Sequence, residues 1–162
     1  MKVKDLMTTA LTTVKDSDPI ARVRRILGDQ SFHAVPVVNH WGDLCGIVTC
    51  ADFVGVSPEE SRRAVRDFMQ APVYTIPETV AVALVARFMC TYRVRHLVVT
   101  NENKPHGIVS TFDLIKAMAE KMSVSSEDRT GADPHRELEL QGLILMDTTG
   151  GSSGSNRPNK AR

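Results

Sequence analysis

Twice in this chain, a hydroxyl residue is followed three positions later by a carboxylate at the end of the same short motif. The stretches GIVTCADFV and GIVSTFDLI place Thr49 before Asp52 and Ser110 before Asp113. A Ser or Thr three residues before an acid is a capping box, which closes the N-terminus of a helix without any ligand. Structural capping is therefore one interpretation of both pairs.

The same groups could also bind a ribonucleotide. The N-terminus of a helix favours an anion, and a carboxylate there can accept hydrogen bonds from two ribose hydroxyls while the hydroxyl residue donates to a phosphate. A possible cation precedes an apolar strand upstream of each pair, His33 before AVPVV and Arg95 before HLVV. A hydroxyl, a carboxylate and a cation in two matching copies favour binding over capping alone.

The two copies differ in the cation. A guanidinium stays charged and can form two hydrogen bonds to a phosphate, whereas an imidazole titrates near pH 6.5 and is mostly neutral above it. We therefore predict that the copy with Arg95 binds phosphorylated ligands more tightly, and that the copy with His33 gains affinity as the pH falls toward about 6.

The elements that must position these residues are duplicated as well. VKDLM matches VRDFM, LTTV matches VYTI, and the helical pattern IARVRRIL matches VALVARFM; AVPVV then falls on RHLVV. A unit of about sixty residues that cannot bury its apolar face alone is expected to pack against its twin about a pseudo-two-fold axis. Each half then contributes to the core of the other.

Local signals place helices and hairpins in the first half. Asp18 and Pro19 predict the start of a helix, and Gly28 predicts a left-handed end to it. The turn cluster NHWGD predicts a β hairpin between two apolar runs. Further helices are expected from Thr49 and, because of a capping box, from Ser57.

The second half repeats this order, with helices over 77–90 and 110–122 and a hairpin around NENKP. On the first helix, Arg24 and Arg25 are expected to form a solvated face. After residue 122 the chain becomes rich in Ser, Gly and charge, which predicts disorder over 123–162. Within it, the apolar stretch 138–146 either adds a strand or partner contact or has no function.

Composition excludes several classes of function. The net charge of +1 gives no field to attract nucleic acid or an acidic membrane, and no run approaches the length needed to span a bilayer. Cys45, Cys50 and Cys90 have no CxxC spacing, and the N-terminus lacks the apolar core of a signal peptide. We expect a cytoplasmic protein with reduced thiols, no metal site, no membrane partner and no nucleic-acid partner.

The paired pattern VKDLM…TV…HAVPVV…GIVTCAD and VRDFM…TI…RHLVV…GIVSTFD resembles a tandem pair of cystathionine-β-synthase (CBS) domains, often called a Bateman module. The resemblance implies an α+β fold in which two β-α-β-β-α repeats, over 1–62 and 63–122, pack sheet to sheet with pseudo-two-fold symmetry. It also implies two clefts that commonly bind AMP, ADP, ATP or S-adenosylmethionine, and a homodimer.

The resemblance assigns roles to residues in each cleft. In cleft 1, Asp52 would hold the ribose and Thr49 and His33 the phosphate, with the adenine read by the backbone near Thr12, Thr13 and Val14. In cleft 2, the corresponding residues would be Asp113, Ser110 and Arg95, with Tyr74, Thr75 and Ile76.

Family members often carry basic residues at two consecutive positions before the apolar strand. We assign one such basic residue to each half, His33 beside Ala34 and Arg95 beside Val94. The strand proline, Pro36, is matched to Leu97.

Three functions follow from these interpretations. The favoured one is a regulatory module, with no chemistry and no cofactor of its own, that binds an adenine nucleotide and signals to a dimer or an unidentified protein target. Its interface would include Leu114, Ile115 and Met118 on the helix after the second motif. The alternative is a dimerisation scaffold with empty clefts. An enzyme is the weakest reading, because the sequence has no metal-ligand cluster and no Cys/His set.

Overall fold

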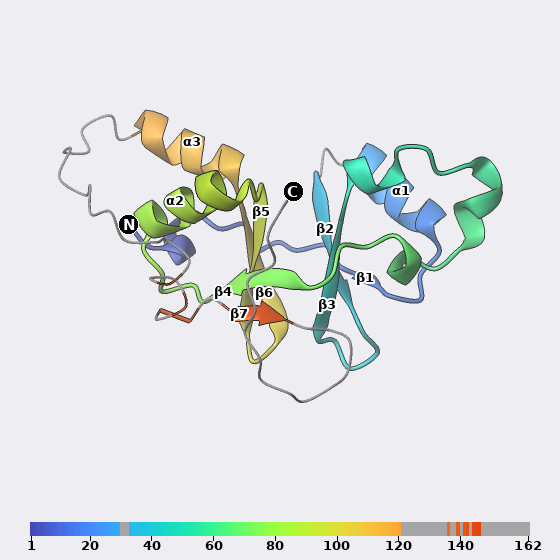
Figure 1. The fold of residues 1–162 in the computed structure, drawn as a ribbon, viewed down its shortest axis with the longest axis horizontal. Coiled ribbons are helices and arrows are strands. Elements are labelled where there is room, and N and C mark those ends of the chain that lie inside the picture. The colour runs from blue at the N-terminus through green and yellow to red at the C-terminus, as the bar shows by residue number, and fades with distance from the viewer. Residues whose placement is uncertain (30–32, 121–135, 137–138, 140, 143, 147–162) are drawn as a thin grey trace.

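Two β sheets face each other across the middle of the molecule in this computed structural model (Figure 1). The structure describes residues 1–29, 33–120, 136, 139, 141–142 and 144–146. The first half forms a sheet in the order β1-β2-β3, and the second half forms a sheet in the order β6-β5-β4-β7. Helices cover the outer faces of the sheets, so the inner faces meet each other.

The first half follows the predicted order of elements. It contains β1 (Val14–Lys15), α1 (Ile20–Asp29), β2 (Ala34–Val38) and β3 (Leu44–Thr49). β1 pairs in parallel with β2 through the α1 crossover, and β2 and β3 form the predicted antiparallel hairpin. The predicted helix end at Gly28 is wrong: α1 continues through this exposed glycine, whose φ is not in the left-handed region.

The second half contains β4 (Val73–Ile76), α2 (Val82–Tyr92), β5 (His96–Asn101), β6 (Lys104–Ser110) and α3 (Thr111–Glu120). α2 begins later than predicted because Glu78 and Val80 use their carbonyl groups to accept hydrogen bonds from the N-terminal segment. It ends at Arg93, which takes the left-handed conformation with φ of 54°. α3 begins one residue after Ser110, as the capping box predicts.

Each half completes the core of the other by exchanging its first turn. Val3, in the 3₁₀ turn Val3–Asp5, is 0% exposed and packs in the core of the second half with Phe88. Val65, in the matching turn Val65–Asp67, is 0% exposed and packs in the core of the first half. The reciprocal exchange makes the two repeats structurally dependent on each other.

The inner faces of the sheets bury a third apolar cluster. Its buried members are Leu44, Ile47, Val73 and Val98. In addition, the amide of Leu44 donates a 2.9 Å hydrogen bond to the carbonyl of Asn103, which joins the hairpin turns of the two halves. The predicted sheet-to-sheet packing of two repeats is therefore the arrangement found.

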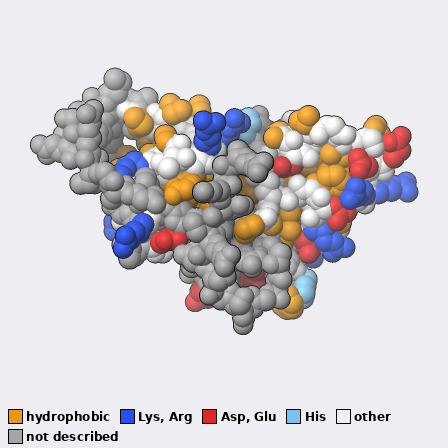
Figure 2. Space-filling view, in the orientation of Figure 1, with side chains coloured by type: hydrophobic (Ala, Val, Ile, Leu, Met, Phe, Trp, Pro, Cys, Tyr) orange, Lys and Arg blue, Asp and Glu red, His pale blue; other side chains and the backbone are white. Residues whose placement is uncertain are grey.

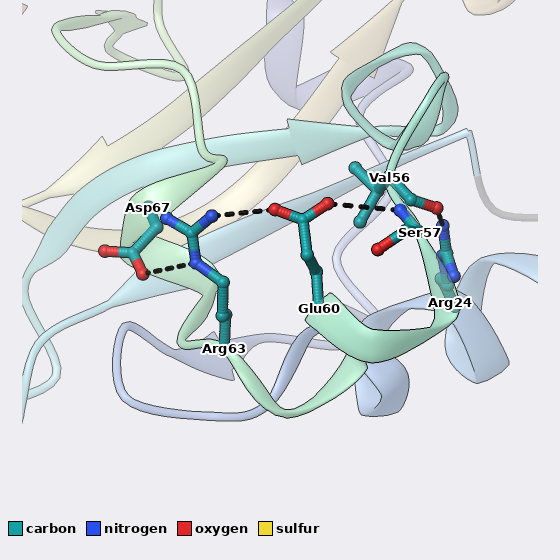
Figure 3. Close-up of polar contacts among 6 residues, drawn as sticks. All are labelled: Arg24, Val56, Ser57, Glu60, Arg63 and Asp67. Atoms are coloured by element: carbon teal, nitrogen blue, oxygen red, sulfur yellow. Dashed lines mark hydrogen bonds and ion pairs between the residues drawn. The ribbon is translucent and has the colours of Figure 1, made fainter.

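The connection between the halves contains short 3₁₀ turns where longer helices were expected. These turns, Cys50–Phe53 and Pro58–Arg62, are separated by Gly55, whose φ of 81° no helix accommodates. Glu60, three positions after Ser57, accepts a 3.1 Å hydrogen bond from the Ser57 amide, and its other oxygen lies 2.8 Å from Arg63 (Figure 3).

Arg24 braces this connection, contrary to the expectation of a solvated face. Its guanidinium donates a 2.8 Å hydrogen bond to the carbonyl of Val56 (Figure 3). It also lies 5.7 Å from the ring centre of Phe53. Arg25 is exposed, as predicted. One arginine of the predicted pair therefore contributes to tertiary structure, and the other does not.

The apolar stretch 138–146 contributes a short strand. β7 (Ile144–Met146) pairs antiparallel with β4 and extends the second sheet. This matches the strand-forming alternative for the stretch. The disorder predicted for 123–162 falls largely on residues outside the described part of the chain.

The outer face of α3 is apolar and exposed. Phe112, Ile115 and Met118 are 69%, 61% and 65% exposed and follow one another at helical spacing. Leu114, which was expected at an interface, is only 6% exposed and belongs to the core of the second half. This expectation was wrong for Leu114 because its side chain lies on the opposite face of the helix.

Candidate functional site

A cavity of about 850 Å³ lies between the two halves. Its wall takes residues from the Thr49 turn, from the segment that enters β4, and from the start of β5 and of α3. Figure 2 shows basic side chains beside a histidine at the upper edge of the molecule, between the two sheets. The lining residues with polar or ionisable side chains are His33, Thr49, Cys50, Gln70, Tyr74, Tyr92, Arg93, Arg95, His96, Ser110 and Thr111.

The cavity brings together residues that were assigned to two different clefts. His33 and Thr49 of cleft 1 line it together with Tyr74, Arg95 and Ser110 of cleft 2. The remaining predicted residues are not in its wall; they are Thr12, Thr13, Val14 and Asp52 of cleft 1 and Thr75, Ile76 and Asp113 of cleft 2. The structure thus gathers the hydroxyl and cationic groups of both halves around one space.

The side chains of Val14, Thr75 and Ile76 are buried, with exposed fractions of 1%, 2% and 0%. They pack in the protein interior and offer no side-chain surface to a ligand. Only their backbone groups remain for the role that the family resemblance implies for them.

Asp52 is held by donors from two segments. Its Oδ2 accepts hydrogen bonds from the amide and the hydroxyl of Thr49, at 2.6 and 2.8 Å. The side-chain amide of Gln70 donates to Oδ1 at 2.9 Å and approaches Oδ2 at 3.2 Å. Both carboxylate oxygens therefore have partners within the protein.

Asp113 repeats the first part of this arrangement without the second. Its Oδ2 accepts hydrogen bonds from the amide and the hydroxyl of Ser110, at 2.7 and 2.6 Å. The amide of Asp113 in turn donates to the Ser110 hydroxyl oxygen at 3.3 Å. Among the residues that the structure describes, none donates a hydrogen bond to Oδ1 of Asp113.

Both turns therefore contain the contacts of a cap. The hydroxyl protons of Thr49 and Ser110 are directed to their own carboxylates, so each hydroxyl oxygen can accept from a ligand but must rotate to donate to a phosphate. The cations nearby are the groups that are left to bind an anion directly.

The ladder register corrects the alignment of the two strands. Ala34 pairs with Thr49 and His96 pairs with Ser110, so His96 occupies the place of Ala34 and Arg95 that of His33. Matching Ala34 to Arg95 was wrong by one residue.

Two consequences follow from this register. The second half has two consecutive basic residues where its strand begins, Arg95 just before β5 and His96 as its first residue. The position of Pro36 is taken by Val98, because Pro36 pairs with Ile47 and Val98 with Ile108.

His96 is a cavity residue whose pKa is shifted by its surroundings. Burial lowers its pKa below the usual 6.5, the proximity of His33 and Arg95 acts in the same direction, and Asp113 opposes them. A neutral imidazole in this place can become a cation when an anionic ligand arrives, because the ligand's charge would favour the protonated form.

Sequence reasoning missed several lining residues. Arg93 and His96 could have been found from the string RVRH, in which three basic residues fall within four positions. Gln70 carries no local signal, since its partner Asp52 lies 18 positions away. No three His, Cys, Asp or Glu side chains in the described part of the chain gather closely enough to hold a metal ion.

Comparisons with known proteins agree with this architecture. Uncharacterized protein YlbB of Bacillus subtilis is 30% identical over 135 residues, which cover 81% of this chain and 87% of that protein. Three other curated relatives are longer, and the chain spans only 36%, 43% and 45% of their length. Within the described residues, no helix has the length and hydrophobicity to cross a membrane.

Solved structures show the same fold. The CBS domain pair of protein MJ0100, in complex with 5′-methylthioadenosine and S-adenosyl-L-methionine, has a TM-score of 0.68 and 24% identity over 75% of this chain and 98% of that one. CBSX2 in complex with AMP has a TM-score of 0.66 and 22% identity over 74% of this chain and 96% of that one.

A family model for the CBS domain matches the chain twice, over residues 3–59 and 65–120. The two matches coincide with the two halves that exchange their first turns and enclose the cavity. The chain belongs to the CBS-domain family and contains two CBS domains in tandem.

Proposed function

We propose that this chain is a regulatory module that binds an adenine nucleotide or S-adenosylmethionine between its two CBS domains. The observation that carries the proposal is the cavity of about 850 Å³, into which both domains direct hydroxyl and basic groups. Its volume lies within the range of small-molecule sites. The ligands in the related structures, AMP, 5′-methylthioadenosine and S-adenosyl-L-methionine, all contain adenosine.

Arg95 is the main phosphate-binding group in this proposal. It lines the cavity together with Arg93, His96 and His33, so four groups that carry or can take up positive charge line one space. Charge-assisted hydrogen bonds are the stronger ones, and a guanidinium can bind a phosphate with two of them. Asp113 is not in the cavity wall itself but accepts a hydrogen bond from Ser110, which is. It would hold the ribose, since its Oδ1 accepts no hydrogen bond within the described residues.

A ligand in this place would couple the two domains. Because the cavity wall is shared, binding favours the relative position of the halves that best closes on the ligand. The first residues of α3, Thr111 and Phe112, also line the cavity, and the same helix carries the exposed apolar face. We propose that α3 transmits the bound state to a second copy of the chain or to another protein, without any catalytic step.

A dimerisation scaffold is the second candidate. Its support is the exposed apolar row of Phe112, Ile115 and Met118, together with the fact that both acid–hydroxyl pairs form complete caps. In this alternative the carboxylates only stabilise the turns, and no adenosine compound changes the stability of the protein.

Thermal unfolding with a ligand panel separates the two candidates. AMP, ADP, ATP, S-adenosylmethionine, 5′-methylthioadenosine and GTP are added at equal concentration to wild-type protein. A ligand at about 100 times its dissociation constant adds about 2.7 kcal/mol to the folded state, which raises the melting temperature by several degrees in a domain of this size. We expect such a shift from at least one adenosine compound and none from GTP.

Two arginine variants make the test specific to the cavity. Arg95→Ala should abolish the shift with a phosphorylated ligand, while any shift with uncharged 5′-methylthioadenosine should persist. Arg62→Ala removes another exposed arginine, from a turn outside the cavity wall, and should leave every shift intact. The absence of a shift with all six compounds would contradict the proposed function and favour the scaffold.

A further inference from the structure

We propose that Gln70 acts as an internal lock on the first CBS domain. Its side-chain amide donates hydrogen bonds to the carboxylate of Asp52. Asp113 of the second domain then provides the principal ribose-binding carboxylate. This inference rests on the proposed function and specifies which of the two equivalent carboxylates a nucleotide uses first.

Gln70 and Thr8 occupy equivalent places in the two halves. The backbone of Gln70 exchanges hydrogen bonds with Ile47 at 3.1 and 2.8 Å, and the backbone of Thr8 exchanges hydrogen bonds with Ile108 at 2.9 and 3.0 Å. The preceding methionines also match, since Met69 lies against Gly46 as Met7 lies against Gly107. The symmetry therefore relates a long amide side chain in one half to a short hydroxyl side chain in the other.

The contacts of the two carboxylates differ at this one position. Gln70 reaches Asp52 with its amide nitrogen, 2.9 Å from Oδ1 and 3.2 Å from Oδ2. Thr8 makes no side-chain hydrogen bond to Asp113 or to any other residue that the structure describes. The hydrogen bonds that Thr49 and Ser110 donate to their carboxylates are otherwise the same.

An amide on Asp52 competes with a ligand for the same acceptor atoms. A ribose binds a carboxylate by donating hydroxyl hydrogen bonds, and the Gln70 amide already donates to both oxygens of Asp52. The ligand must displace this hydrogen bond at Asp52, whereas no described residue donates a hydrogen bond to Oδ1 of Asp113. One hydrogen bond to a charged group corresponds to roughly a tenfold difference in affinity between the two domains.

Titration calorimetry with AMP tests the lock. Wild-type protein should bind one equivalent of AMP tightly, and Asp113→Asn should abolish this binding while Asp52→Asn leaves it in place. Gln70→Thr copies the equivalent residue Thr8 and should tighten binding at the first domain roughly tenfold, so that a second equivalent is measured. The double variant Gln70→Thr/Asp52→Asn should lose this second equivalent.

The reverse exchange provides the matched control. Thr8→Gln places a long amide opposite Asp113 and should weaken the first equivalent by a similar factor. Melting temperatures without ligand show that each variant is folded.

The possible failures are distinct. If wild-type protein binds AMP and neither exchange changes affinity or stoichiometry, or if the tight equivalent depends on Asp52, the lock is refuted and the proposed function stands. If AMP binds neither wild-type protein nor Gln70→Thr, the result counts against both.

Discussion

The two strand-to-helix turns begin with the same contacts and continue differently. At Thr49 and at Ser110, a hydroxyl and a backbone amide donate to one oxygen of the following aspartate. After Ser110 the chain forms α3, a ten-residue α-helix, whereas after Thr49 it forms a four-residue 3₁₀ turn. A capping box therefore fixes where a helix can start and does not fix how long it becomes.

The residues after each cap explain the difference. The segment TFDLIKAMAE contains no Gly or Pro and continues as a helix. The segment CADFVGVSPEE contains Gly55 and Pro58, and Gly55 takes a left-handed φ of 81°. The first domain thus ends in a connection of short turns, which Arg24 holds by its hydrogen bond to Val56. The second domain ends in α3, which has an exposed apolar face.

The largest predicted effect is a loss of stability on truncating side chains in the hydrophobic cores of the two halves. The core of the second half contains Phe88, which is 0% exposed and packs against Tyr74 and Tyr92 with ring-centre distances of 5.0 and 4.6 Å. The core of the first half consists largely of valines such as Val35. Phe88→Ala should lower the free energy of unfolding by about 4 kcal/mol and Val35→Ala by about 2 kcal/mol.

Urea denaturation measures both changes. Because each half completes the other's core, both variants should unfold in a single transition. Two separate transitions would show that the halves are independent, contrary to the exchange of Val3 and Val65.

The second prediction concerns the carboxylates as structural groups. Asp113→Ala removes a cap and should cost about 1 kcal/mol, while Asp52→Ala also releases Gln70 and should cost about 2 kcal/mol. Chemical denaturation without ligand measures the two values. If Asp113→Ala loses more stability than Asp52→Ala, the length of the helix that follows determines how much each cap stabilises the protein, and the number of hydrogen-bond donors to the carboxylate does not.

The third prediction tests the brace on the connection. Arg24→Ala removes a hydrogen bond to Val56 and a contact with the Phe53 ring, and should cost about 1 kcal/mol. Arg25→Ala, on the exposed side of the same helix, is the control and should change the stability little. Proteolysis within 50–62 should also become faster in Arg24→Ala. Equal stability of the two variants would refute the bracing role.

The smallest predicted effect is a pH dependence of stability that comes from His96, whose equivalent in the first half is Ala34. Burial holds the pKa of His96 below its unfolded value of about 6.5, so the unfolded chain takes up a proton that the folded chain resists. The contribution of His96 to stability is therefore present above pH 6.5 and is lost as the pH falls below it.

His96→Ala copies Ala34, its equivalent in the first half, and should reduce the fall in melting temperature between pH 7.5 and pH 5.5. His106→Ala, at an exposed histidine 3.3 Å from Glu78, is the control for the general loss of an imidazole. An unchanged pH dependence in His96→Ala would show that this residue does not titrate differently in the folded protein.

Local signals in the sequence were sufficient for the order of elements. The start of α1 after Asp18 and Pro19, the two hairpins and the start of α3 depend on residues within a few positions of each other. The repeat then placed the matching acid and hydroxyl residues in both halves. These features could be predicted because capping and turn preferences act along a short stretch of chain.

The register of the inner strands could not be predicted in the same way. AVPVV and HLVV are buried on both faces, so they lack the alternation of polar and apolar residues that fixes a register. A shift of one residue concealed the equivalence of His96 with Ala34. Contacts between distant segments, such as those of Gln70 with Asp52 and of Arg24 with Val56, likewise have no local signal.

The central claim is that the cavity between the two CBS domains binds an adenosine ligand through the second domain. The most direct measurement is a crystal structure of the protein grown with the compound that gives the largest thermal shift. We predict that the adenosine lies in the cavity, with any phosphate beside Arg95 and the ribose at Asp113, and that Gln70 still contacts Asp52. An empty cavity at saturating ligand, or a ligand held by Asp52 alone, would contradict this account.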